Sequence, residues 1–410
     1  MLGQAPGLSL RKLHELLATL GEDVGPRGGS GHQSLSQALG ALLAILTPFG
    51  ALLQTMVLKC VDGAEFVWTY VHPFALLHIL CSKFKAFAML LTGCTRHAPE
   101  FSFLALYSDE TVPGNPMRPD FDNQVQCFYW TLLQLPAWFR CKKHGWFLLA
   151  TMPTRIQEKL DGGLTYVFQR LLKDVFFQPA SFNFSIGVPL PDGRGASFLH
   201  RVEMGPFIQD EKAQKNTNSV KGAAGTRCCL MCRNILNIDP QRILHHPYFK
   251  HYATAKYESF HLHTAESFWE SADMLACAVN SGAAKTHIEA LEQALGIKYA
   301  KNGLVWDTYM RRHYNPVLQT FWDWMHCLYG AGGYAQFEVN LFVKELVRIG
   351  KTLEQLDEFA QSICNLTGKL KPHFFQKRTV MEEGEQKKNK KHKKHKKRKV
   401  SILSKPLLLK

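Results

Sequence analysis

The chain has 410 residues, 46% of them hydrophobic, and carries a formal net charge of +15 at pH 7. So much apolar sequence can build a core for two or three domain-sized units, which argues against wholesale disorder. Among the eleven cysteines, only Cys228, Cys229 and Cys232 cluster. An odd and dispersed set argues against a small secreted disulfide scaffold and favours a reducing compartment.

The N-terminal part predicts a flexible arm followed by helices. Residues 1–32 are Gly-rich with scattered charges and lack the charged-then-apolar order of a signal peptide. Residues 33–97 predict a helical N-terminal region. Within it, residues 38–58 are apolar enough to imitate a membrane span, but Pro48 and Gly50 interrupt them, which favours a buried helical hairpin turning there. We therefore expect no membrane partner.

Short apolar runs bounded by Pro, Gly, Asn or Asp follow from residue 101 and predict buried strands. The expected strands are 101–107, 125–135, 146–151, 182–188 and 196–208, with helical spacing over 155–176 between the third and the fourth. The order strand, strand, strand, helix, strand predicts an α/β fold with an RNase H-like mixed sheet. We assign this core to residues 98–350, with a Cys- and His-containing helical insertion at about 226–320.

The C-terminal part predicts helices and then a tail. Residues 334–366 form an amphipathic helix or helix pair by their spacing, and 351–380 are assigned to a C-terminal helical segment. Residues 381–410 predict a basic disordered tail, because ten Lys and Arg lie between Lys387 and Lys399 with almost nothing apolar to bury. Such a run is typical of nuclear-import signals and of phosphate contacts, so we expect a nuclear protein that binds DNA.

Two aspartates each close an expected strand, namely Asp109 and Asp210. Cleavage of a phosphodiester with two metal ions needs carboxylates that converge from different parts of the chain, and a strand end holds such a ligand rigidly. Glu338, on the later helix, is the candidate third acid, with Glu345 as its rival. These residues predict a catalytic site for Mg²⁺ or Mn²⁺. Taken singly, each aspartate is better explained by a turn or a helix cap, and only their matching places in the predicted topology favour a metal site.

Three strings resemble blocks of eukaryotic DDE/D cut-and-paste DNA transposases of the CACTA and Plavaka-like kind. They are Leu106-Tyr107-Ser108-Asp109-Glu110 with the following Pro113-Gly114-Asn115-Pro116, then Asp210 with the Gly-rich Lys221-Gly222-Ala223-Ala224-Gly225, and finally Asp323-Trp324-Met325-His326. The resemblance covers about residues 65–350. It implies an RNase H-like core that cleaves transposon ends and joins them to target DNA, and a homo-oligomer.

The insertion contains a candidate zinc site. Cys229-Leu230-Met231-Cys232 has the two-residue gap that lets two thiolates meet one tetrahedral ion. The resemblance pairs this string with the Asp-x-x-His string and so implies structural Zn²⁺ held by Cys229, Cys232, Asp323 and His326. Local closure by His246 and His251 stays open, and so do two cysteines without a metal.

The leading hypothesis is transposase-like, metal-dependent DNA cleavage and strand transfer, in which water attacks first and a freed 3′-OH then attacks target DNA. The alternative is a catalytically inactive, transposon-derived nuclear DNA-binding protein. It is kept because no end-recognition domain is evident ahead of the core, as expected of a truncated or decayed copy. A helical membrane protein is the weaker alternative and depends on residues 38–58 alone.

Overall fold

The computed structural model describes residues 45–97, 101–112, 123–142, 145–179, 182–253, 257–323, 327–328 and 334–364. The chain divides into two compact units, Met1–Asp323 and Trp324–Lys410, and each is described by itself. The boundary falls inside the expected core 98–350, so Glu338 belongs to the second unit. The expected arm 1–32 and basic tail 381–410 lie outside the described residues.

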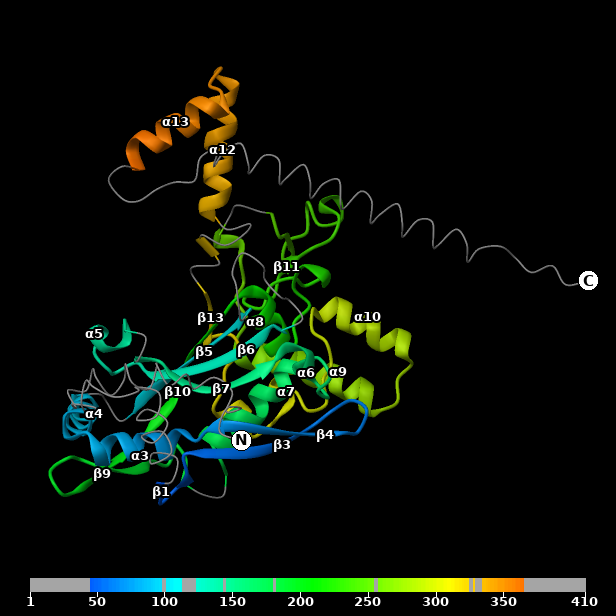
Figure 1. Cartoon of the computed structure of the whole chain (residues 1–410). Helices are drawn as coiled ribbons and strands as arrows, with labels where there is room; N and C mark the ends of the chain where they lie inside the picture. The colour runs from blue at the N-terminus through cyan, green and yellow to red at the C-terminus, as the bar shows by residue number, and fades with distance from the viewer. Residues whose placement is uncertain are drawn as a thin grey trace, which may run out of the picture. The chain divides into compact units, whose positions relative to one another are not determined.

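A five-stranded mixed sheet organises the first unit (Figure 1). Its order is β13-β10-β5-β6-β7, with bounds β13 (Thr320–Trp322), β10 (Val202–Gln209), β5 (Ser102–Thr111), β6 (Val125–Leu132) and β7 (Phe147–Pro153). Strands β5, β6 and β7 form an antiparallel meander, whereas β10 and β13 run parallel to β5. The predicted α/β class with a mixed sheet is therefore confirmed.

One face of this sheet carries the main hydrophobic core. Phe128 of β6 and Phe207 of β10 lie opposite residues 108 and 106 of β5, which share a face because alternate side chains of a strand point the same way. Both rings therefore point to helix α7 (Gly163–Arg170). The Phe168 ring on α7 lies 5.3 Å from the Phe128 ring and 4.4 Å from the Phe207 ring. Such edge-to-face packing fixes the helix on the sheet.

The helical span expected over 155–176 is broken in the structure. It comprises α6 (Thr154–Gln157), α7 and a π-helical segment, η4 (Leu171–Phe176). Gly162 precedes α7 and Gly163 begins it, and both adopt positive φ angles, which favour glycine. The periodicity identified the buried face of the helix but not this break.

The N-terminal region is a correction to the sequence prediction. Within the region expected to be helical, the structure has strands β1 (Leu46–Thr47), β2 (Gly50–Ala51), β3 (Leu53–Lys59) and β4 (Glu65–Val71), the first three of them in the expected helical hairpin. The predicted turn at Pro48 and Phe49 is present, but it joins β1 to β2. Burial alternates along β3 and β4, with Leu58 and Trp68 buried and Val67 exposed. This period of two, combined with β-branched residues, is the signal that overall hydrophobicity hid.

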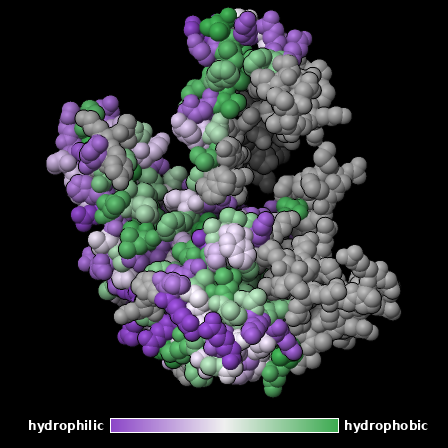
Figure 2. Space-filling view, turned by 90° about the vertical axis from the view of Figure 1, so that its left-hand side faces the viewer, coloured by the Kyte–Doolittle hydropathy of each residue, from purple (hydrophilic) through white to green (hydrophobic). Residues whose placement is uncertain are grey.

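Helices α3 (Pro73–Lys83) and α4 (Lys85–His97) complete that region and were expected as helices. Across the described ranges, no single helix has the length and apolar character of a membrane span. The pair α3 and α4 meets that standard jointly, with a bend of 116° between its members. On the face shown in Figure 2, hydrophobic and hydrophilic residues are interspersed.

A second correction concerns the strands before the insertion. The expected strand at 182–188 is replaced by β8 (Val188–Pro191), and the expected strand at 196–208 is two strands, β9 (Ser197–His200) and β10. The β8–β9 turn is held by Asp192, whose Oδ1 accepts hydrogen bonds from the backbone N–H groups of Arg194 and Ala196. A short Asx-type turn of this kind reverses the chain between the two expected strands, and the unexpected break within 196–208 falls at Arg201, between β9 and β10.

The insertion is irregular at first and then helical. Its short strands β11 (Ile235–Leu236) and β12 (Lys250–His251) precede α9 (Ala265–Asn280) and α10 (Lys285–Leu295). A capping box formed by Thr264 and Ser267 starts α9. The predicted helical insertion is therefore α-helical in its middle part, over α9 and α10. In the second unit, α12 (Tyr334–Arg348) and α13 (Leu353–Cys364) form the predicted helix pair.

Candidate active site

Three aspartates from the sequence analysis lie at one edge of the sheet. Parallel neighbours present their carboxyl ends together, and β13, β10 and β5 are such neighbours. Tyr107 of β5 pairs with Ile208, and Gln209 pairs with Trp322. Continuing this register puts Asp109, Asp210 and Asp323 at matching positions on adjacent strands, and the Asp323 N–H donates to the Gln209 carbonyl over 2.9 Å.

A bulge in β10 sets this register. The pairing with β5 shifts between Met204 and Phe207, where β10 contains one residue more than its partner. Gly205 lies there, and an added Cβ would stand 2.9 Å from the Leu104 carbonyl oxygen, so the close approach requires glycine. Because a slip of one residue exchanges the two faces of a strand, the bulge decides that Asp210 lines up with Asp109.

Tyr107 brings two of the carboxylates together. Its hydroxyl oxygen lies 3.1 Å from Asp109 Oδ2 and 3.4 Å from Asp323 Oδ2. Burial, and then the two neighbouring carboxylates, raise the pKa of Tyr107 far above its ordinary value, so the phenol stays protonated and donates. The Asp323 side chain is buried, and Asp109 Oδ1 also accepts the Glu110 N–H over 2.8 Å.

Aromatic side chains surround the Tyr107 phenol. The Tyr129 ring, directly across on β6, has its centroid 6.2 Å from that of Tyr107, and the Trp146 ring lies 6.1 Å away at a steep angle. Burial, aided by Cys127 and Asp109, raises the pKa of Tyr129 to about 12. The carboxylate pair therefore borders a cluster of three half-buried rings.

Asp210 caps a helix, which was one of the two roles that the sequence allowed for it. It is the N-cap of α8 (Glu211–Thr217), and its Oδ1 accepts the Ala213 N–H over 2.6 Å. Nearby, Glu110 accepts a hydrogen bond from Thr154 and forms an ion pair with Lys212 at 3.2 Å, which links β5 to the start of α8. The cap orients Asp210 at the same edge as Asp109.

The candidate third acid lies in the second unit. Glu338 is exposed on α12, and its hydrogen bond with Tyr334 raises the pKa of that phenol. The rival Glu345 is held by Arg348 through contacts of 2.8 and 2.6 Å, which lower the pKa of Glu345. The assignment of Glu338 to the metal site stays a prediction.

The zinc assignment also stays a prediction. Asp323 lies beside Tyr107, and His326 falls outside the described residues. Over the described ranges, no three His, Cys, Asp or Glu side chains form a group able to hold a metal. In the alternative zinc site, His246 and His251 would be ligands, but one ring nitrogen of each already accepts a backbone hydrogen bond. His246 Nδ1 accepts the Phe249 N–H over 2.9 Å, and His251 Nδ1 accepts the Ala253 N–H over 3.2 Å.

The two insertion cysteines nevertheless act on each other. A hydrogen bond from the Cys232 thiol, supported by backbone N–H groups of Met231 and Cys232, lowers the pKa of Cys229 to about 6 despite burial. The same contact and burial raise the pKa of Cys232. Cys229 is therefore set up to be a thiolate near neutral pH.

Carboxylate oxygens are the ligands that Mg²⁺ prefers, and this ion is commonly held by only one or two carboxylates together with substrate phosphates. The donor chemistry of Asp109 and Asp323, with Asp210 at the adjoining position, fits that requirement. Sequence reasoning missed the shared role of Tyr107. The alternation of Tyr107 and Asp109 on one strand face was the available signal.

Comparison with known proteins does not place the chain in a family. No protein-family model matches the sequence, and a search of curated proteins returns no significant match.

Proposed function

We propose that the chain is a transposase-like enzyme that cleaves and joins DNA with Mg²⁺ or Mn²⁺ held at the carboxyl edge of β5, β10 and β13. The observation that carries the proposal is the convergence of Asp109 and Asp323 on the Tyr107 hydroxyl, with Asp210 in register between their strands. Perturbed titratable groups gathered at a strand edge are characteristic of functional sites.

The strand connections support an RNase H-like core. In that fold an antiparallel meander of three strands is extended, beside its first strand, by two strands parallel to the first. The order β13-β10-β5-β6-β7 and the strand directions agree with this description. Asp109 lies on the first strand of the meander and Asp210 directly follows the fourth strand, the two places where the transposase-like strings put them.

Each group at the edge has a chemical role in the proposed reaction. Asp109 and Asp323 would supply oxygen ligands, and Asp210 would add a third at the start of α8. Glu338 stays the candidate third acid predicted from the sequence. The bound ions would activate water and stabilise the leaving oxygen. Tyr107 donates to the carboxylates and orients them. DNA phosphates would complete the ligand sphere, while the basic run Lys387 to Lys399 would hold the backbone.

A nicking assay tests this proposal. The full chain is expected to nick supercoiled plasmid in Mg²⁺ or Mn²⁺ but not in EDTA. Asp109→Asn should reduce nicking by more than the roughly 10–100-fold that loss of a supporting contact costs, because it removes a ligand. Asp174→Asn is the matched control, since Asp174 pairs with Arg170 on the α7 side.

Two results would contradict the proposal. Equal nicking by the parent and Asp109→Asn would place the chemistry elsewhere or reveal a contaminating nuclease. DNA binding by the parent without metal-dependent nicking would favour the alternative, a transposon-derived nuclear DNA-binding protein without catalysis. Measuring DNA affinity and nicking on the same preparation separates these outcomes.

A further inference from the structure

We propose that Tyr107 is a positioning residue that joins Asp323 to Asp109 as one metal-binding pair, so that Asp323 serves the catalytic edge. This inference rests on the proposed function, since it names residues of the same site. It differs from the ligand assignment suggested by the Asp-x-x-His string, which puts Asp323 with the insertion cysteines.

The need for a bridging side chain follows from the sheet. Asp109 is on β5 and Asp323 follows β13, and β10 lies between these two strands. Neighbouring strands are about 4.8 Å apart, so the two backbones are separated by roughly 10 Å. A phenol is long enough to cross the intervening strand. The Tyr107 hydroxyl does so, reaching Oδ2 of both Asp109 and Asp323.

The position of the phenol is itself fixed. Tyr107 pairs across β5 and β6 with Tyr129, and the Trp146 ring meets it edge-on. A side chain packed between strand neighbours presents its hydroxyl at one place, and such preorganisation lowers the cost of assembling a site. Both carboxylates then lie within reach of metal ions spaced about 3.5–4 Å apart.

Removal of the hydroxyl should separate the carboxylates while leaving the fold in place. In Tyr107→Phe the ring keeps its packing, but the hydroxyl that contacts both carboxylates is lost. Loss of a hydrogen-bond partner of a ligating carboxylate typically weakens metal binding about 10–100-fold. We expect Mn²⁺ binding to weaken about tenfold, the lower end of that range, and nicking to be largely restored at saturating Mn²⁺.

Tyr129→Phe is the matched control. Tyr129 lies directly opposite Tyr107, is half-buried like it, and has its hydroxyl engaged by the Cys127 thiol. Mn²⁺ affinity of the full chain is measured by electron paramagnetic resonance, together with thermal unfolding. The expected result is about tenfold weaker Mn²⁺ binding for Tyr107→Phe alone, with both variants unfolding near the parent temperature.

A double-mutant cycle separates positioning from general damage. Asp323→Asn should weaken Mn²⁺ binding, and adding Tyr107→Phe should cost less than the two single losses combined, because both changes remove one coupled unit. Additive losses, equal losses in the two Tyr variants, or parent-like binding by Tyr107→Phe would overturn the inference while leaving the proposed function intact. If the parent itself binds no Mn²⁺ at millimolar concentration, the inference and the proposed function both fail.

Discussion

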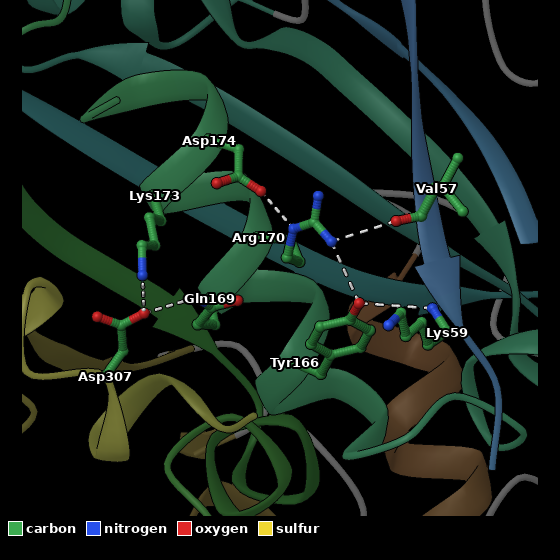
Figure 3. Close-up of polar contacts among 8 residues, drawn as sticks. All are labelled: Val57, Lys59, Tyr166, Gln169, Arg170, Lys173, Asp174 and Asp307. Carbon is green, nitrogen blue, oxygen red and sulfur yellow. Dashed lines mark hydrogen bonds and ion pairs between the residues drawn. The ribbon is translucent and has the colours of Figure 1, made fainter. Parts of the chain in front are cut away.

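Two clusters of charged side chains in the first unit are built on opposite principles. On the α7 side, each carboxylate meets a cation: Asp307 lies 2.7 Å from Lys173, and Asp174 pairs with Arg170 (Figure 3). At the sheet edge, two carboxylates meet the same phenol hydroxyl. The first arrangement pairs each carboxylate with a cation, whereas the second brings two carboxylates to one hydroxyl donor.

The surroundings of the α7 cluster explain its compensation. Arg170 also donates to the Val57 carbonyl over 3.2 Å, and the Lys59 backbone N–H donates to the Tyr166 hydroxyl over 3.4 Å. Asp307 accepts a hydrogen bond from the Gln169 side chain over 2.6 Å. These contacts attach β3 and the insertion to α7. A paired network of this kind supports the fold. Carboxylates that converge on one donor, beside tyrosines whose pKa values are raised, are instead the pattern of a functional site.

The second unit repeats this contrast on one helix. Glu338 interacts with the Tyr334 phenol, as Asp109 does with Tyr107, whereas Glu345 is paired with Arg348. We therefore expect Glu338→Gln to lower metal-dependent nicking by about 100-fold or more while DNA affinity stays near that of the parent. Glu345→Gln should keep nicking. The reverse pattern, measured on the same plasmid assay, would transfer the third-acid role to Glu345.

Breaking the α7 cluster should affect stability alone. Asp307→Asn leaves the Lys173 ammonium without its partner and should lower the free energy of unfolding by about 1–2 kcal/mol, seen as a fall of a few degrees in the unfolding temperature. Asp174→Asn, at a more exposed pair, should cost less than about 1 kcal/mol. Mn²⁺ affinity should not change in either variant; a tenfold loss would remove the distinction between the clusters.

The insertion cysteines extend the comparison to sulfur and give a pH dependence. With the pKa of Cys229 lowered to about 6, its thiol is protonated below that pH and becomes a reactive thiolate above it. Alkylation of Cys229, followed by mass spectrometry, should be half-maximal near pH 6, ahead of Cys228, whose pKa burial raises. Cys232→Ala should move the midpoint upward. Protection of both Cys229 and Cys232 until a chelator is added would instead favour the predicted zinc site.

The last prediction concerns the basic run from Lys387 to Lys399, whose charge is opposite in sign to that of the carboxylates at the sheet edge. Deleting residues 386–400 should weaken DNA binding equally for all sequences and reduce the slope of log affinity against log salt by about 0.9 for each lost phosphate contact. Filter binding over a salt series measures this slope. An unchanged slope would show that the run from Lys387 to Lys399 does not contact DNA.

The sequence predicted the sheet edge better than the rest of the molecule. Asp210 directly follows β10 as expected, whereas Asp109 lies inside β5, which continues to Thr111. The helix pair of the second unit was predicted from its spacing. The helical prediction for residues 45–71 was wrong, because their apolar composition masked the alternation of buried and exposed side chains. The position of Asp323 beside β10 could not be predicted from the sequence, because β13 has only three residues and its partner strand is far away in the sequence.

Anomalous diffraction from crystals of the full chain soaked in Mn²⁺ tests the central claim most directly. The account predicts a Mn²⁺ peak at the edge of the sheet, with Asp109 and Asp323 oxygens about 2.1–2.2 Å from the ion and the Tyr107 hydroxyl beside both carboxylates. Anomalous density confined to other residues, or none at millimolar Mn²⁺, would contradict it.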